Sequence, residues 1–305
     1  MSSGAGAKHS KIAPLPIRHG VSPSYAWLQT PEPCLALAWL VARYPDITTE
    51  IWLSRMARGE VVDGAGARIA PDTLLRRGMR VWYYREIEAE PRIPFDEVIL
   101  HRDEHLLVVD KPHFLPTTPG GRFLHESLLV RLKDKLGEPM LTPIHRLDRE
   151  TAGVVMFSRR EESRGAYHSL FSERSIEKTY EALAAQMARE FPFTHRSRMV
   201  EGTPFFRMME VAGEPNSETL VDQIGMLGDS ALYRLQPHTG RKHQLRVHMA
   251  ALGAPILNDA FYPEALPIKD DDFDKPLKLL ARAISFVDPL SGEPRRFEST
   301  RTLHP

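Results

Sequence analysis

The sequence predicts an α+β fold, in which a mixed and mainly antiparallel sheet is interspersed with helices. Two β-rich runs at 98–100 and 106–110 are separated by a short polar stretch, which favours an antiparallel pair. Helical stretches do not alternate regularly with such runs, and this argues against a parallel doubly wound sheet. A length of 305 residues indicates about two domains.

The first part of the chain is expected to hold a tail and a small module. Residues 1–24 are rich in Gly, Ser, Ala and Pro, which predicts a flexible tail. Residues 25–90 are expected to form a compact helix-helix-hairpin module. Its predicted elements are two amphipathic helices and two short strands, at 35–44, 48–58, 61–62 and 81–84.

A larger domain is expected over residues 95–305, after a proline-bounded linker at 91–94. Its predicted helices are 127–136, 162–173 and 243–252. Its predicted strands are 98–100, 106–110, 154–157, 179–183, 220–222, 231–235, 284–286 and 296–297.

Composition limits the kinds of site that the chain can hold. The single cysteine, Cys34, excludes an intramolecular disulfide and a cysteine-rich zinc site, and it suits a reducing cytoplasm. No segment approaches the roughly 20 continuous apolar residues of a membrane span, so no membrane association is expected. His238, His243 and His248 are spaced so that they do not share one helical face, and no metal is expected.

Charge is distributed unevenly although the formal net charge is zero. Residues 231–250 contain four Lys or Arg residues, three histidines and no acid, while aspartates gather at 270–274. A neutral total can therefore conceal one basic cleft, which would favour a nucleic-acid partner. A solvated charged face explains the charge pattern equally well.

The most informative motif is PIHRLDRETAG at residues 143–153. It places Asp148 between Arg146 and Arg149 at a turn, directly before the apolar run 154–157. Positive charge on both sides favours the ionised carboxylate, which is the form that a nucleophile needs. Taken alone, this pattern more often marks a structural ion pair at a turn, so a nucleophilic role for Asp148 depends on the other motifs of the chain.

Further blocks occur in the order typical of one family. They are LLVVDKP at 106–112, KTYEAL at 178–183, TGRKHQLRVH at 239–248, LGAPILND at 252–259, and LARAISF at 280–286 with SGE at 291–293. Together with HRLD and TAG at 145–153, they resemble the RluA-type pseudouridine synthases over about residues 95–300. Ala152 stands where the family usually has serine, and Ala254 where histidine is common. Neither is a nucleophile or base position.

The resemblance implies a sheet with a central catalytic cleft and an RNA pseudouridine synthase that needs no cofactor. It implies that Asp148 is the nucleophile, attacking either the anomeric carbon of ribose or the base, or else acts as a base in an elimination route. Tyr180 is the implied active-site tyrosine, which stacks on uracil and passes a proton if its pKa is lowered. Arg241 is the expected partner that keeps Asp148 ionised.

Other residues in these blocks are expected to contact the RNA. Arg146 is implied to lie near the space that a flipped-out uridine leaves. Arg246 is a second candidate for the partner of Asp148, although we expect it to hold phosphate or structure. Lys111 is expected in a loop, with phosphate contact and simple exposure equally favoured. His145 and His243, in the same blocks, are also expected to bind substrate.

The small module resembles an alpha-L RNA-binding domain, although the Arg-Leu-Asp that usually begins that domain is missing. Five arginines favour RNA binding by the module, namely Arg55, Arg58, Arg76, Arg77 and Arg80. An extra binding module suits a large target, so ribosomal RNA is favoured as substrate over transfer RNA. A monomer is expected. The alternative from another class is a catalytically silent RNA-binding protein, against which the combination of Asp148, Tyr180 and Arg241 argues.

Overall fold

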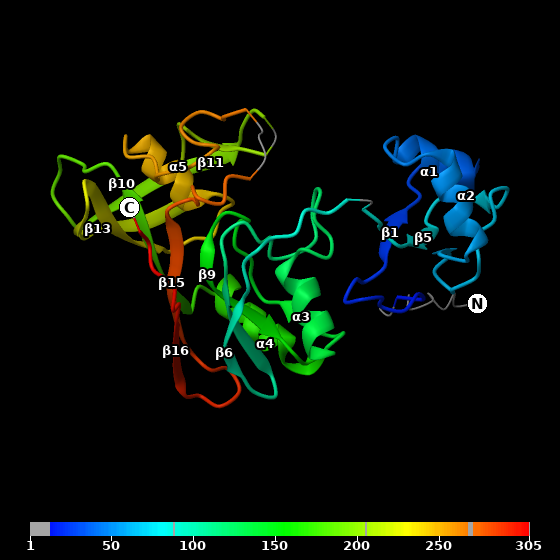
Figure 1. The fold of residues 1–305 in the computed structure, drawn as a ribbon, viewed down its shortest axis with the longest axis horizontal. Helices are drawn as coiled ribbons and strands as arrows, with labels where there is room; N and C mark the ends of the chain where they lie inside the picture. Colours follow the sequence, from blue (N-terminus) through cyan, green and yellow to red (C-terminus); the bar gives the residue numbers. More distant parts are fainter. Residues whose placement is uncertain (1–12, 88, 205, 268–270, 305) are drawn as a thin grey trace, which may run out of the picture. The chain divides into compact units, whose positions relative to one another are not determined.

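The computed structural model describes residues 13–87, 89–204, 206–267 and 271–304 (Figure 1). The chain forms two compact units, Met1–Glu90 and Pro91–Pro305. Among the described residues, no helix has both the length and the apolar character needed to span a bilayer.

The first unit packs two helices against short strands. The helices are α1 (Ala36–Arg43) and α2 (Thr49–Ala57), and the strands are β1 (Ser24–Trp27), β2 (Cys34–Leu35), β3 (Val61–Val62), β4 (Leu74–Leu75) and β5 (Arg80–Tyr83). Both helices were predicted, and Thr48 caps α2 by accepting a hydrogen bond from the Ile51 amide at 3.4 Å. The two predicted strands pair with each other, because β5 runs antiparallel to β3, and β1 adds a third strand on the other side of β5 that was not predicted.

The region expected as a tail is only partly described, because residues 1–12 lie outside the described residues. Residues 13–24 pack against the module. The Tyr84 hydroxyl donates to the Pro16 carbonyl at 2.6 Å, and Arg18 pairs with Glu60 at 2.5 Å. Ser24 already belongs to β1. The module therefore includes part of the chain that composition alone assigned to the tail.

The second unit is built on one sheet. Its strands within the described residues are β6 (Val98–Arg102), β7 (Leu106–Lys111), β8 (Thr142–Pro143), β9 (Ala152–Ser158), β10 (Ile176–Ala184), β11 (Phe193–Glu201), β12 (Met208–Val211), β13 (Ser217–Leu227), β14 (Ser230–Pro237), β15 (Leu279–Val287) and β16 (Pro294–Glu298). The main order is β12-β11-β13-β14-β10-β15-β9-β7-β6. The β9–β15 pair is parallel and the other pairs are antiparallel, which confirms the predicted mixed, mainly antiparallel sheet.

Within the part of this unit that the structure describes, three helices cover the sheet, as predicted: α3 (Leu128–Leu136), α4 (Glu161–Ser172) and α5 (Gln244–Ala251). Alternate residues of β7 pack with different helices, because Leu107 joins the cluster that contains α3 whereas Leu106 joins the cluster that contains α4. The strands β7 and β9 are consequently buried on both faces. Helix α5 packs through Leu245 and Met249 on the β10, β13 and β14 side of the sheet.

One residue of β15 brings two distant motifs together. Ala281 pairs with Gly153 of β9 on one side and with Tyr180 of β10 on the other. Gly153 has φ +115°, and a Cβ there would lie 2.2 Å from the Ala281 carbonyl oxygen. Only glycine allows this close approach. The strand that follows the Asp148 turn is thereby placed one strand away from Tyr180.

Candidate active site

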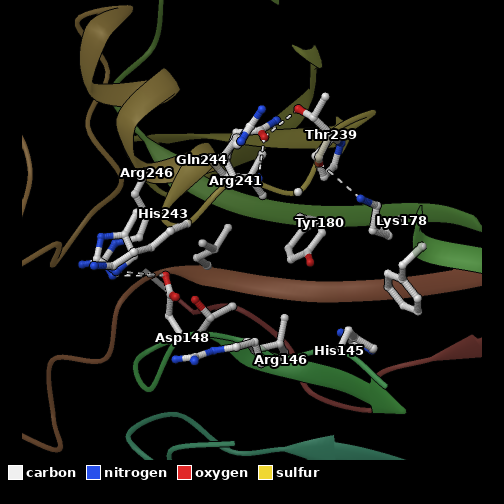
Figure 2. Close-up of a pocket in the computed structure, with 18 residues that line it drawn as sticks. His145, Arg146, Asp148, Lys178, Tyr180, Thr239, Arg241, His243, Gln244 and Arg246 are labelled. Carbon is white, nitrogen blue, oxygen red and sulfur yellow. Dashed lines mark hydrogen bonds and ion pairs between the residues drawn. The ribbon is translucent and has the colours of Figure 1, made fainter. Parts of the chain in front are cut away.

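A pocket of about 670 Å³ lies where the motif segments meet. Its wall comes from the Asp148 turn, from β10 and from the turn before α5 (Figure 2). The lining includes seven of the eight predicted site residues: His145, Arg146, Asp148, Tyr180, Arg241, His243 and Arg246. These residues come from segments far apart in the sequence, so the fold brings them together.

The carboxylate of Asp148 faces the buried guanidinium of Arg246. Arg246 Nη1 lies 3.4 Å from Asp148 Oδ2, and the side chain of Arg246 is only 1% exposed. Arg246 also binds Asp259 bidentately, with Nε–Oδ2 and Nη2–Oδ1 distances of 2.8 and 2.7 Å. Burial alone would lower the pKa of Arg246, but the Asp259 hydrogen bonds and neighbouring carboxylates raise it. A fixed positive charge therefore stands beside Asp148.

Asp259 anchors this arrangement. Its Oδ1 also accepts backbone N–H bonds from Phe261 at 2.8 Å and from Tyr262 at 3.2 Å. A buried carboxylate with this many donors holds the Arg246 guanidinium in one orientation. Sequence reasoning did not single out Asp259, although it closes the block at 252–259.

The expected pairing of Asp148 with Arg241 was wrong. Arg241 lies in the turn before α5, its side chain is exposed, and its Nε donates to the Asn216 carbonyl at 3.1 Å. Arg246 lies inside the helix on its buried side. Arg246, the second candidate, is the residue that pairs with Asp148. Its nitrogens are used by carboxylates inside the protein, so of the two roles expected for it, phosphate or structure, the structure shows the second.

His243 completes the surroundings of Asp148. It adopts φ +54° immediately before α5, its Nε2 is 3.8 Å from Asp148 Oδ2, and its Nδ1 is 3.0 Å from the Tyr262 hydroxyl. Burial lowers the pKa of His243, and the charge of Asp148 opposes this shift. A neutral imidazole therefore borders the carboxylate on the α5 side.

Tyr180 projects into the pocket from β10 (Figure 2). Burial raises the pKa of its phenol, and the negative charge of Asp148 raises it further. The condition for proton transfer by Tyr180, a lowered pKa, is therefore not met in this structure. A protonated, half-buried ring is suited to stacking on a base.

The side chains of His145 and Arg146, in the same HRLD segment, differ in how many protein contacts they make. Arg146 is exposed and makes no hydrogen bond or ion pair with any residue that the structure describes. His145 stacks on Phe171 with ring centroids 4.8 Å apart, and its Nε2 accepts a hydrogen bond from the Met156 amide at 3.1 Å. Burial lowers the pKa of His145 to about 3, and the charge of Lys178 acts in the same direction. His145 thus shapes the wall while Arg146 is free to bind a ligand.

The expectation of an exposed or phosphate-binding Lys111 was wrong. Lys111 is the fully buried last residue of β7. Its Nζ donates to the carbonyls of Pro112, Leu115 and Arg149 at 3.0, 2.7 and 3.1 Å. The apolar run LLVV before it already buries this strand, and the ammonium finds its partners in the loop carbonyls.

The same loop holds the chain on the other side of Asp148. Thr117 Oγ1 donates to the Leu147 carbonyl at 2.9 Å and lies 3.1 Å from the Leu147 amide. His113 Nδ1 lies 2.6 Å from the Glu150 carbonyl. The backbone before and after Asp148 is therefore fixed by Thr117, Lys111 and His113. Sequence reasoning did not single out Thr117 or His113.

Comparison with known proteins places the chain in a family. The family model described as RNA pseudouridylate synthase matches residues 105–251. An uncharacterized RNA pseudouridine synthase of Synechocystis is 29% identical over 233 residues, covering 74% of this chain and 79% of the relative. The dual-specificity RNA pseudouridine synthase RluA of Haemophilus influenzae is 32% identical over 208 residues, covering 66% of this chain and 91% of the relative.

A solved structure supports the fold. The human RNA pseudouridylate synthase domain containing 1 has a TM-score of 0.57 at 24% identity, covering 70% of this chain and 86% of that one. The predicted family and its isomerase class are thus confirmed. This chain belongs to the RluA-type family of RNA pseudouridine synthases.

Proposed function

We propose that Asp148 is the nucleophile with which this enzyme converts uridine to pseudouridine in structured RNA. The observation that carries the proposal is the position of Asp148. Its side chain is 25% exposed, it lines the pocket, and the buried Arg246 lies beside it. The guanidinium orients the carboxylate, and the pocket leaves the carboxylate open to a substrate.

The reaction is an isomerisation, in which one carbon–nitrogen bond breaks and one carbon–carbon bond forms within the same nucleotide. The uridine has to leave the helix stack first, at a cost of a few kcal/mol. Arg146 is free to occupy the vacated space, and Tyr180 offers a face on which uracil can stack. Asp148 then assists departure of uracil from ribose, and the base turns over before the new bond forms.

The test in cells uses a strain that lacks the gene, complemented with the wild type or with Asp148→Asn. Pseudouridine mapping of total RNA should show sites that the wild type restores and Asp148→Asn does not. Asp134→Asn, a change at an exposed position on α3, is the control and should restore them. Restoration by Asp148→Asn would contradict the assignment. The restored sites also identify the RNA.

Ribosomal RNA is the substrate that we favour, with transfer RNA as the alternative. The reason is the first unit, for which we propose RNA binding. Three of its five arginines have protein partners, because Arg55 and Arg58 pair with glutamates and Arg80 stacks on aromatic rings. Arg76 and Arg77 are exposed. The proposed contact with phosphate therefore rests on these two residues.

The salt dependence of RNA affinity tests this role. Replacing both Arg76 and Arg77 by alanine should reduce the slope of log affinity against log salt by about two, because each phosphate contact contributes about one. An unchanged slope would contradict RNA binding by this part of the module. Restored sites confined to transfer RNA in the mapping experiment would favour the alternative substrate.

A further inference from the structure

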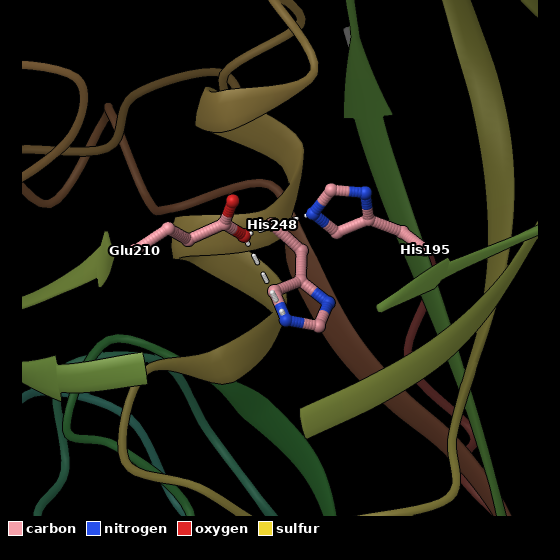
Figure 3. Close-up of side chains that lie close together, drawn as sticks. All are labelled: His195, Glu210 and His248. Atoms are coloured by element: carbon pink, nitrogen blue, oxygen red, sulfur yellow. Dashed lines mark hydrogen bonds and ion pairs between the residues drawn. The ribbon is translucent and has the colours of Figure 1, made fainter. Parts of the chain in front are cut away.

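A group of three side chains that could hold a metal ion lies outside the pocket (Figure 3). His195 comes from β11, Glu210 from β12 and His248 from α5. Glu210 Oε1 is 2.9 Å from His195 Nε2 and 3.9 Å from His248 Nε2. All three potential ligand atoms lie within 4.8 Å of one another. Three separate elements thus direct one ligand atom each toward a common point.

We propose that His195, Glu210 and His248 bind one divalent transition-metal ion, with Zn²⁺ as the best fit. Two imidazoles and a carboxylate form a known ligand set for Zn²⁺, in which a fourth position remains for water. Metal–ligand distances of about 2.0–2.1 Å in a tetrahedron separate the ligand atoms by roughly 3.4 Å. The two distances to Glu210 lie on either side of this value, so small side-chain rotations suffice.

Burial around the group fits an ion that is held from the protein side and open on the other. The side chain of His248 is 1% exposed, whereas those of His195 and Glu210 are 20% and 21% exposed. Water therefore has access to the fourth position while the helix side is closed. The contacts that a metal would replace are also visible. His248 Nε2 is 3.0 Å from Ser217 Oγ and 3.2 Å from Ser197 Oγ.

The serines keep a partner when the imidazole turns to a metal. Ser217 Oγ donates to the Ser197 carbonyl at 2.8 Å, and the two hydroxyls are 3.0 Å apart. A metal here would join the β11–β12 pair to α5, the helix that carries Arg246. The spacing of His238, His243 and His248 in the sequence could not indicate this site. His243 faces Asp148, and the partners of His248, which lies in helix α5, come from strands β11 and β12.

The test is metal binding by the full-length protein after removal of metals with a chelator. Equilibrium dialysis should show one tightly bound Zn²⁺ per chain, and Co²⁺ in its place should give the visible absorption of a tetrahedral site without a thiolate charge-transfer band. Each of His195→Ala and Glu210→Gln should weaken binding at least about tenfold, since even indirect partners of a metal have effects of this size.

His101→Ala is the matched control. His101 Nε2 lies 2.8 Å from Asp103 Oδ2, so it also forms a histidine–carboxylate pair, outside the proposed site. Its loss should leave the metal affinity unchanged. Glu210→Gln keeps the shape of the side chain and guards against a folding defect in His195→Ala. The proposal is overturned if the wild type binds no stoichiometric metal, if both variants bind like the wild type, or if a thiolate band assigns the metal to Cys34.

Discussion

The floor and the rim of the pocket use the same kind of residue in different ways. The floor, defined as Asp148, Arg246 and Asp259, is a network in which the buried guanidinium of Arg246 has carboxylates on two sides. The rim, defined as Arg146, Arg241 and Lys242, is exposed. Residue type alone does not separate Arg246 from Arg241. Burial does, and we propose that the buried Arg246 positions Asp148 while the exposed rim binds phosphate.

The difference between floor and rim is tested most strongly by making the same substitution at Arg246 and at Arg241. Arg246→Met should lower the free energy of unfolding by about 3–5 kcal/mol, because it leaves the buried Asp259 without its countercharge. Arg241→Met should change it by no more than about 0.5 kcal/mol. Chemical denaturation of both variants measures the difference. Equal and small losses would show that the floor is not a stabilising network.

The buried Lys111 predicts a pH dependence of stability. Burial lowers the pKa of Lys111 to about 7 in the folded protein. The unfolded chain, where the ordinary value of 10.5 applies, therefore binds more protons between these pH values, and stability from this group rises with pH. From pH 7 to 9 the wild type should gain about 2 kcal/mol relative to Lys111→Met. Parallel stability curves for the two proteins would contradict this.

Two substitutions of Tyr180 distinguish a ring that stacks on the base from a phenol that transfers a proton. Because the phenol pKa is raised, Tyr180→Phe should keep the single-turnover rate within about tenfold, the size of one lost hydrogen bond. Tyr180→Leu should be slower than Tyr180→Phe, since a stacked aromatic ring contributes about 1–3 kcal/mol per base. Equal rates for the two variants would argue against stacking.

The rim should show the smallest effects. Arg241→Ala and Lys242→Ala should each reduce the salt slope of RNA affinity by about one. The single-turnover rate at saturating RNA should change little, because neither side chain contacts Asp148 in the structure. A large loss of rate in Arg241→Ala at saturation would restore the original assignment of Arg241 to the floor.

The sheet and its helices could be predicted because their signals are local. Apolar, β-rich runs predicted β6, β7, β9, β10 and β13 to β16, and helical stretches of the sequence predicted α3 to α5. Strands β1, β2, β4, β8, β11 and β12 were missed. Strands β2, β4 and β8 have only two residues each, and β11 is strongly polar, as expected for a strand whose residues are mostly exposed or half-buried. Strands β1 and β12 have four residues each.

The site was predictable as a set of segments but not as a set of contacts. The motifs named Asp148 and Tyr180, which do line one pocket. Whether Arg241 or Arg246 pairs with Asp148 depends on where α5 begins, and a shift of one residue turns a helical side chain by about 100°. The roles of Lys111 and Thr117 depend on backbone carbonyls and amides, which carry no residue-specific signal.

The rate of pseudouridine formation by Asp148→Asn tests the central claim most directly. It should be measured in a single turnover at saturating RNA concentrations. The RNA should contain a uridine that the wild type modifies in the mapping experiment. The rate should fall by more than about a thousandfold, as expected when a nucleophile is lost, while the RNA dissociation constant stays within a few fold. A rate within about tenfold of the wild type would contradict a catalytic role for Asp148.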